Sequence, residues 1–183
     1  MKIIITGVPG TGKTQLGKAI AKEMRCELIE INGIVKRKGI YRKNKSGEMV
    51  VRIEKLGREL KNAIKGKKGF VLEGHLACEM RIPCDFIIVL RCEPKELIRR
   101  LEKRKYPEKK IAENALSEML DYCLVMSEQN YEKRKIVQMD NTKFLTPKIA
   151  LKKLKKGKGE EVRWLGTEKG RKLLKETFKR MGK

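Results

Sequence analysis

Apolar positions along the chain fall into two patterns, short continuous runs and longer stretches with a helical repeat. The runs are rich in Ile, Val, Leu and Phe, which is typical of strands that helices cover on both faces. We expect five such strands, over residues 2–6, 27–31, 70–74, 86–90 and 136–139.

Between the predicted strands, apolar residues recur every three or four positions, as they do on one face of an amphipathic helix. Strands that alternate with helices predict an α/β fold of three layers around a five-stranded parallel sheet. Residues 39–52 are polar and basic, with turn signals at Asn44 and at residues 46–47. We expect helices over residues 13–24, 34–38, 56–64, 94–101 and 112–126, and one more that opens at Thr146 and Pro147.

A glycine-rich turn joins the first predicted strand to the first predicted helix. Residues 7–14 read GVPGTGKT and match the phosphate-loop pattern GxxxxGK[ST]. Gly10 and Gly12 let the backbone wrap closely around phosphate oxygens, and the loop amides form an anion site at a helix N-terminus. Lys13 would reach the β and γ phosphates, and the Thr14 hydroxyl would bind Mg²⁺. We therefore predict nucleotide binding rather than a purely structural glycine turn.

An acid and the single histidine of the chain follow the third predicted strand. Glu73 ends that strand, where phosphate-loop proteins hold Mg²⁺ or its water, although an ordinary strand-end carboxylate is the alternative. His75 lies two residues later. For it we weigh a role at the phosphates or the attacking group against a structural role.

Basic residues are dense between residues 99 and 110, after the fourth predicted strand and its helix. The run is either a solvated face or a flap that closes over the phosphates and delivers an arginine to the developing charge. Tyr106 and Pro107 interrupt the helical pattern, which favours the flap, with Arg104 as its arginine.

Charge sets this chain apart from an ordinary globular protein. Its 183 residues include 46 Lys plus Arg against 23 Asp plus Glu, a formal net charge of +23. Such an excess predicts attraction to nucleic acid, nucleotides or an acidic partner, and a Lys/Glu-rich surface of the heat-adapted kind is the alternative. Residues 36–68 hold thirteen basic and three acidic residues, and residues 151–183 hold thirteen basic and four acidic residues.

Composition also excludes several classes of protein. Hydrophobic residues make up 40% of the chain, which argues against global disorder. No apolar run approaches the roughly 18 residues of a membrane span, and the first residues lack a secretory signal pattern. Five scattered cysteines without a CxxC pair indicate buried thiols in a reducing cytosol rather than disulfides or zinc. We therefore expect a cytoplasmic protein with no membrane partner.

Several of these segments together resemble a known family, the archaeal and eukaryotic nuclear-type adenylate kinases. These phosphate-loop nucleoside monophosphate kinases also act as ATPase factors in small ribosomal subunit assembly. The resemblance covers about residues 1–150, and the RLEKRKYPEKKIAEN run is its most specific part. The segments that carry it are ITGVPGTGKT, INGIVKRKGIY, VLEGH, FIIVLR and RLEKRKYPEKKIAEN.

The resemblance implies that different segments of the chain have different roles. Residues 1–154 would form the kinase domain, with a monophosphate-binding segment over about residues 30–53 and a short lid over about residues 103–113. Residues 155–183 lie outside the resemblance as a basic C-terminal extension, either a solvated tail or a functional arm. Arg104 would be the lid arginine, and Glu73 and His75 would stand at the family's Asp-Tyr-His strand-end site. ATP would be held by Gly10, Gly12, Lys13, Thr14, Gln15, Arg104 and Lys143.

The chain also departs from the family pattern. Glu73 stands where the family has Asp, Gly74 replaces an aromatic residue, and no acid follows Gly33 in the monophosphate segment. The resemblance implies Mg²⁺-dependent phosphoryl transfer from ATP to AMP, giving two ADP, with Lys13, Arg104 and His75 at the reacting groups. A second hypothesis is an ATP-switched assembly factor that binds a small-subunit ribosomal protein and rRNA. A third is a phosphate-loop kinase for another small acceptor.

Overall fold

The computed structural model describes residues 1–44, 49–157, 159–166 and 168–181. A five-stranded parallel sheet forms its centre, with strand order β2-β5-β1-β6-β7. The predicted α/β fold is therefore confirmed, and every predicted strand is present within one or two residues. The strands are β1 (Lys2–Thr6), β2 (Glu27–Glu30), β5 (Phe70–Glu73), β6 (Phe86–Arg91) and β7 (Ile136–Asp140).

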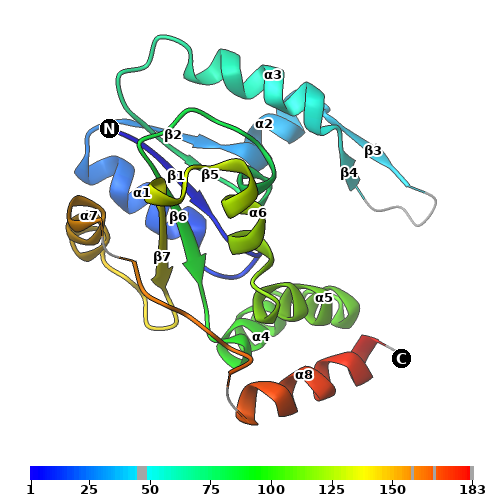
Figure 1. Cartoon of the computed structure of the whole chain (residues 1–183). Coiled ribbons are helices and arrows are strands. Elements are labelled where there is room, and N and C mark those ends of the chain that lie inside the picture. Colours follow the sequence, from blue (N-terminus) through cyan, green and yellow to red (C-terminus); the bar gives the residue numbers. More distant parts are fainter. Residues whose placement is uncertain (45–48, 158, 167, 182–183) are drawn as a thin grey trace.

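Helices cover both faces of the sheet (Figure 1). Side chains alternate between the two faces along each strand, so Ile3 and Ile5 pack with α1 (Lys13–Glu23) and α7 (Pro147–Lys156), whereas Ile4 packs on the other side. That other side carries α2 (Ile31–Arg37), α3 (Ile53–Ile64) and α6 (Tyr122–Asn130). Burying apolar residues on both faces explains why the strands read as continuous apolar runs.

A further group of helices lies beyond the carboxyl end of the sheet. Helices α4 (Pro94–Lys103) and α5 (Glu108–Met119) pack against each other, and α8 (Glu168–Met181) lies along α5 (Figure 1). The described residues also form two short 3₁₀ turns, η1 (His75–Glu79) and η2 (Lys133–Lys135). None of the helices in the described ranges combines the length and the apolar character needed to cross a bilayer.

The basic segment after residue 39 contains a hairpin that the sequence did not predict. Strand β3 (Tyr41–Lys43) pairs antiparallel with β4 (Met49–Val51), with Tyr41 opposite Val51. Val51 and Tyr41 pack on the core beside α3, which anchors the base of the hairpin. Each strand has three residues, too few for a period-two pattern to stand out. The turn signal predicted at residues 46–47 lies outside the described residues.

The predicted long helix over residues 112–126 is wrong, because the chain forms two helices there. Helix α5 ends at Met119, and α6 begins at Tyr122. Asp121, between them, has a left-handed backbone with φ of 56°. The Arg91 guanidinium donates to the Glu118 carbonyl oxygen at 3.0 Å and also to the Asp121 carboxylate. These tertiary contacts hold the break, and the helical spacing of apolar residues does not reveal them.

One helix start differs by a few residues. Helix α2 begins at Ile31, three residues before the predicted helix, and Ile31 is buried. Helix α7 runs to Lys156, so it includes the first two residues of the predicted C-terminal extension, and the domain boundary at residue 154 stays a prediction.

Candidate functional site

The phosphate loop lies between β1 and α1, at the carboxyl end of the central strand of the sheet. Gly10 and Gly12 both have φ of 97°, in the left-handed region that side chains rarely adopt. A Cβ atom on Gly12 would lie 2.5 Å from Asn141 Nδ2, and one on Gly10 would lie 2.6 Å from Leu97 Cδ1. Asn141 Nδ2 also donates to the Thr11 carbonyl at 2.7 Å. The loop is thus held in a wrapped conformation that only glycine allows at these two positions.

Lys13 extends back into the loop that precedes it. Its Nζ donates to the Val8 carbonyl oxygen at 3.0 Å. Burial lowers the pKa of Lys13 most strongly and the charge of Arg104 lowers it further, while the charge of Glu73 acts in the opposite direction. The Lys13 side chain is half-buried, so its ammonium has lost part of its contact with water. A bound polyphosphate would supply the electrostatic stabilisation that the missing water no longer gives.

Thr14 and Glu73, each predicted to hold Mg²⁺, lie side by side at the end of β5. The Thr14 hydroxyl donates to Glu73 Oε1 at 3.1 Å, and Glu73 is 4% exposed. Burial raises the pKa of Glu73, and both the Lys13 charge and the Thr14 hydrogen bond work against that rise. A hydroxyl and a carboxylate oxygen side by side are hard ligands of the kind that Mg²⁺ takes alongside substrate phosphates and water.

His75 follows directly in the turn η1. Its carbonyl oxygen accepts hydrogen bonds from the Thr6 hydroxyl at 3.1 Å and from Cys78 Sγ at 3.0 Å. Burial lowers the pKa of His75 to about 4, and the nearby Lys13 charge adds to the effect. The imidazole is therefore neutral at pH 7 and can accept a proton or a hydrogen bond.

Gly74, which departs from the family pattern, is explained by its neighbour. A Cβ atom at residue 74 would lie 2.7 Å from the Cβ of Ile31, which is fully buried. The first residue of α2 therefore occupies the space that a side chain at residue 74 would need. An aromatic residue there would require a smaller residue at position 31.

Arg104 is the last residue before the α4–α5 turn, and its side chain is exposed. Lys105, the next residue, has a left-handed backbone with φ of 55°, and this reverses the chain. The lowered pKa of Lys13 is due mainly to burial, and the charge of Arg104 makes only a minor contribution to it. The role of Arg104 at the phosphates therefore stays a prediction.

Arg100 was not singled out from the sequence, yet it ties three parts of the site together. Its Nη2 donates to the carbonyls of Asn141 at 2.9 Å and Thr142 at 2.8 Å, and its Nη1 lies 3.5 Å from the Gly10 carbonyl. The guanidinium also sits 4.7 Å from the centre of the Phe144 ring. Its position on the buried face of α4, one residue before Leu101, is the signal that could have distinguished it from Arg99.

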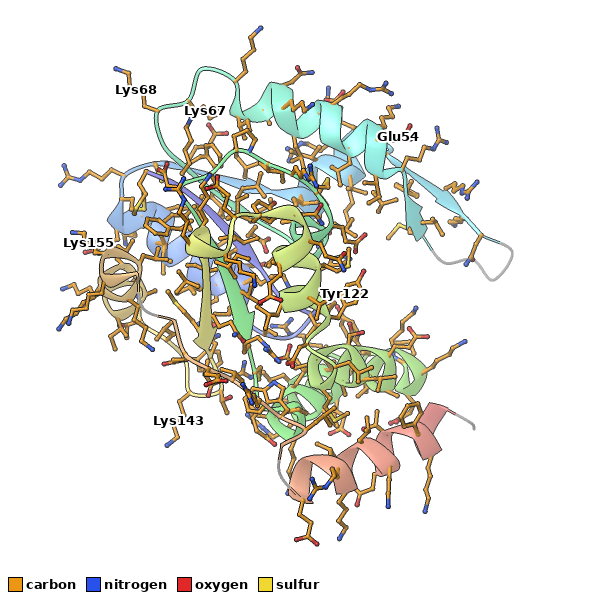
Figure 2. The ribbon with its side chains drawn as sticks, viewed as in Figure 1. Glu54, Lys67, Lys68, Tyr122, Lys143 and Lys155 are labelled. Atoms are coloured by element: carbon orange, nitrogen blue, oxygen red, sulfur yellow. The ribbon has the colours of Figure 1, made fainter. Side chains whose placement is uncertain are left out.

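A cavity of about 240 Å³ lies beside the loop, between α1 and the segment that follows β7. Gln15, predicted for ATP binding, lines it. Lys143, also predicted, does not line it and extends outward from the molecule (Figure 2). The lining residues are Gly12, Gln15, Leu16, Ala19, Asn141, Phe144, Leu145, Thr146 and Pro147.

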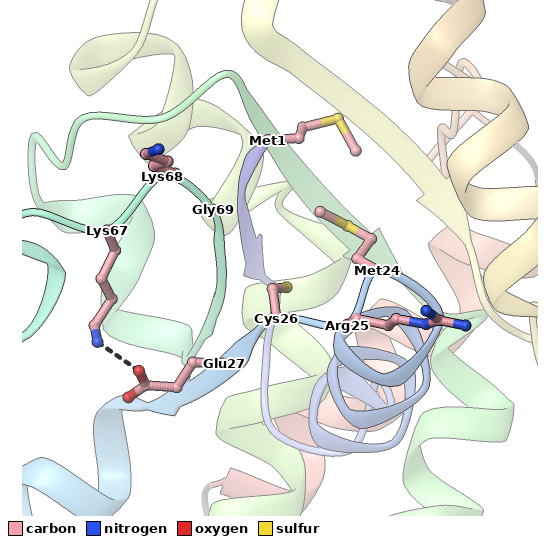
Figure 3. A pocket seen from close by; sticks show the side chains of 8 residues that line it. All are labelled: Met1, Met24, Arg25, Cys26, Glu27, Lys67, Lys68 and Gly69. Carbon is pink, nitrogen blue, oxygen red and sulfur yellow. Dashed lines mark hydrogen bonds and ion pairs between the residues drawn. The ribbon is translucent and has the colours of Figure 1, made fainter.

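A groove of about 420 Å³ lies at the opposite, amino-terminal edge of the sheet (Figure 3). It is bordered by Met1, Met24 and Arg25, and by Lys67, whose Nζ pairs with Glu27 Oε2 at 2.5 Å. None of the predicted site residues lines it. The carboxyl ends of the parallel strands, where ligands bind in open α/β sheets, lie at the other edge.

Comparison with known proteins gives a family match. The family model AAA_18, described as an AAA domain, matches residues 3–121. A protein from Methanocaldococcus jannaschii named "Putative adenylate kinase" is 38% identical over 145 residues, 78% of this chain and 77% of its own length. A Pyrococcus furiosus protein of the same name is 35% identical over 142 residues, 78% of this chain and 76% of its own length.

Solved structures of other kinases share the fold. Shikimate kinase from Bacteroides thetaiotaomicron superposes with a TM-score of 0.58 at 15% identity, over 85% of this chain and 95% of its own. A gluconokinase from Sinorhizobium meliloti gives 0.57 at 15% identity, over 98% of this chain and 96% of its own. The archaeal half of the predicted resemblance is thus confirmed, whereas the link to ribosome assembly stays a prediction.

Proposed function

The chain belongs to the AAA_18 family of phosphate-loop kinases, together with the archaeal relatives described above, and from this premise we propose that it is an adenylate kinase. The reaction would transfer the γ-phosphoryl group of ATP to AMP and give two ADP. The observation that supports it best is the phosphate loop, with Lys13 desolvated inside it and the Thr14–Glu73 pair at its edge.

ATP would bind along the loop and into the neighbouring cavity. The loop amides and Lys13 would hold the phosphates, since a helix N-terminus with an adjacent ammonium is an anion site. Gln15 and Phe144 line the adjacent 240 Å³ cavity, which would receive the nucleoside. Arg100 fixes the loop and the far wall of that cavity relative to each other through its carbonyl contacts.

Thr14 and Glu73 are the residues that would hold Mg²⁺. Their two oxygens lie 3.1 Å apart, and Thr14 directly follows Lys13 of the loop that would carry the phosphates. The ion, when bound, supplies positive charge to the phosphate oxygens. Because burial raises the pKa of Glu73, a cation at this place would also favour its ionised form.

Catalysis would then depend on placed charge rather than on a covalent step. Lys13 would neutralise the oxygens of the transferred group, and Arg104 would approach from the α4–α5 turn and stabilise the charge that develops on them. His75, neutral at pH 7, would accept a hydrogen bond from an attacking group or its water and would not compete with Lys13 for phosphate.

The acceptor would bind opposite the α4–α5 turn. Helix α2 and the β3–β4 hairpin lie above the carboxyl end of the sheet in Figure 1, and α4 and α5 lie below it. Arg37, Arg42 and Arg52, all exposed, lie in this segment and could meet the α-phosphate of AMP. We infer that residues 30–53 form the acceptor segment and residues 103–113 the lid.

Product formation from ATP and Mg²⁺ with each of several acceptors tests the proposal. We expect ADP to form fastest with AMP, and Lys13→Met to lower kcat by at least about a hundredfold. Lys18→Met, which removes an exposed lysine five residues later on α1, is the matched control and should retain activity. ADP appearing equally fast with and without AMP would show a hydrolase, and a faster reaction with shikimate or gluconate would show another acceptor.

The net charge favours a second function, an ATP-switched factor that binds RNA and a ribosomal protein during small-subunit assembly. The excess of +23 is far more than a nucleotide site uses. If RNA phosphates are engaged, the logarithm of affinity for a structured RNA should fall linearly with the logarithm of salt concentration. An affinity that ignores salt, or no binding at low salt, would reject direct contact with RNA.

A further inference from the structure

The C-terminal segment returns to the kinase core after α7 and runs along the free edge of the sheet. Strand β7 is the last strand in the sheet order, so one edge has no strand partner within it. The Glu160 amide donates to the Gln138 carbonyl at 3.0 Å, and Glu160 Oε2 accepts from the Asp140 amide at 2.6 Å. Lys153 of α7 pairs with the same carboxylate. The segment therefore covers an edge that would otherwise leave backbone groups open.

Trp164 continues this contact into a buried cluster of charges. Its Nε1 donates to Glu118 Oε1 at 2.9 Å. The same oxygen accepts from Arg91 Nε at 2.7 Å and from the Cys92 amide at 3.2 Å. The side chains of Glu118 and Arg91 are each 2% exposed, and Arg91 also lies 5.8 Å from the centre of the Trp164 ring. The tryptophan thus completes the hydrogen bonding of an ion pair that is costly to leave incomplete.

Glu118 lies one residue before the end of α5, so its contacts anchor that end of the helix. At the other end of this 12-residue helix is the turn that carries Arg104. Arg91 extends from the end of β6 and binds the Glu118 side chain, the Glu118 carbonyl and Asp121, so it fixes the α5–α6 junction to the sheet. A rigid helix held at one end sets the position of its other end, so a shift at Glu118 moves the turn of Arg104.

Helix α8 adds a second contact on the same body. It lies along α5 (Figure 1), and it buries Thr177, which is 1% exposed, while Phe178 faces solvent at 54% exposure. The extension therefore contacts α5, whose first half belongs to the proposed lid, through α8, and it contacts the end of α5 through Trp164.

We propose that Trp164 is a positioning residue for Arg104, and that the C-terminal segment acts as a support of the lid rather than as a separate arm. The inference rests on the proposed function, because it gives Arg104 the task of meeting the transferred phosphate. Lid movement on binding of nucleotide then reaches Trp164 through α5 and Glu118.

The chain contains one tryptophan, so its fluorescence reports on the surroundings of Trp164. We expect Mg²⁺ with a non-hydrolysable ATP analogue to change the emission of Trp164 in the full-length protein. Arg104→Ala should still bind the analogue, measured by equilibrium dialysis on the same sample, yet lose the emission change. Binding and the signal are thus measured separately.

Kinetics give a second readout. Trp164→Phe keeps a six-membered aromatic ring beside Arg91 and removes the indole N–H together with the five-membered ring that carries it. We expect kcat to fall by about tenfold to a hundredfold while KM for ATP stays within about twofold. Phe178→Ala, an exposed aromatic on the same extension, is the matched control and should leave both unchanged.

The outcomes separate the two proposals. No bound analogue would reject the proposed function, and the inference with it. Bound analogue with unchanged emission, an equal emission change in Arg104→Ala, or wild-type kcat in Trp164→Phe would overturn the inference and leave the proposed function standing. If circular dichroism shows that Trp164→Phe is unfolded, the emission of the wild type and of Arg104→Ala decides.

Discussion

At the scale of single residues, the site contains three ionisable groups whose pKa values are shifted by burial. Lys13 and His75 both have lowered pKa values and Glu73 has a raised one, in each case mainly because water is excluded. Groups with perturbed pKa values cluster at functional sites, where a bound ligand supplies charge that the empty site lacks. These three residues therefore point to the same site as the phosphate-loop sequence.

His75 should make the fold sensitive to acid. Its pKa falls from 6.5 to about 4 on folding, so between these values the unfolded chain takes up a proton that the native protein does not. Stability is therefore lost as pH falls through this window, by at most about 3 kcal/mol. Urea unfolding of the wild type and His75→Gln at pH 7, 5.5 and 4.5 measures this, and the variant should lose less stability. Parallel curves would contradict the burial of the imidazole. Glu73 has the opposite sign and cancels in the difference.

Arg100 and Arg99 form a natural pair for comparison. Arg100 binds Glu96 at 2.9 Å and Arg99 binds it at 2.7 Å. Arg100 also donates to the carbonyls of Asn141 and Thr142, which follow β7. Arg100→Ala would leave the carbonyls of Asn141 and Thr142 without their donor and should cost about 3–5 kcal/mol. Arg99→Ala breaks an exposed pair and should cost no more than about 1 kcal/mol. Denaturant unfolding and ATP binding of both variants provide the measurement, and equal losses would refute the special role of Arg100.

At the scale of elements, helix α3 shows how burial of an apolar stripe contributes to stability. Leu56 and Leu60 are buried on one face of the helix, and Glu54 projects into solvent near its first turn (Figure 2). The stripe packs on the face of the sheet that carries α2, and this places the segment that we assign to the acceptor.

Leu60→Ala should destabilise the protein by about 2–5 kcal/mol, because it removes a buried side chain and leaves a cavity. Lys61→Ala, the exposed neighbour on the same helix, should stay within about 0.5 kcal/mol of the wild type. Chemical denaturation of both variants tests the packing of α3. Similar midpoints for the two would mean that α3 does not contribute to the cooperative core.

The elements also differ in how well the sequence predicts them. The strands were predictable because two buried faces force a continuous apolar run, as in Ile3, Ile4 and Ile5. The β3–β4 hairpin was not, since its three-residue strands are mostly exposed and only Val51 and Tyr41 touch the core. The α5–α6 break was also missed, because the apolar repeat continues from Ala112 to Met126 while Asp121 adopts a left-handed backbone between them.

At the scale of the whole molecule, the net charge of +23 should act on stability as well as on binding. A compact chain with this excess repels itself, and salt screens the repulsion. Raising NaCl from about 10 mM to about 150 mM shortens the screening length from about 30 Å to about 8 Å. We expect a gain of about 1 kcal/mol, which is about 2–4 °C in Tm for a chain of this size.

Thermal melting of the wild type and of Lys13→Ala across this salt range provides the measurement. The variant separates general screening from anion binding at the phosphate loop, and both proteins should gain equally. A Tm that falls with salt would show that attractive ion pairs outweigh the repulsion.

By itself, the sequence determined the five strands of the parallel sheet, most of the helices between them, the phosphate loop, and Thr14 and Glu73 as candidate Mg²⁺ ligands. These features are local or periodic, so spacing and residue type carry them. Only the tertiary structure revealed the role of Arg100, the reason for Gly74 beside Ile31, and the docking of Trp164 on Glu118. Those contacts join residues far apart in the chain, and they depend on backbone carbonyls and buried space that no residue pattern encodes.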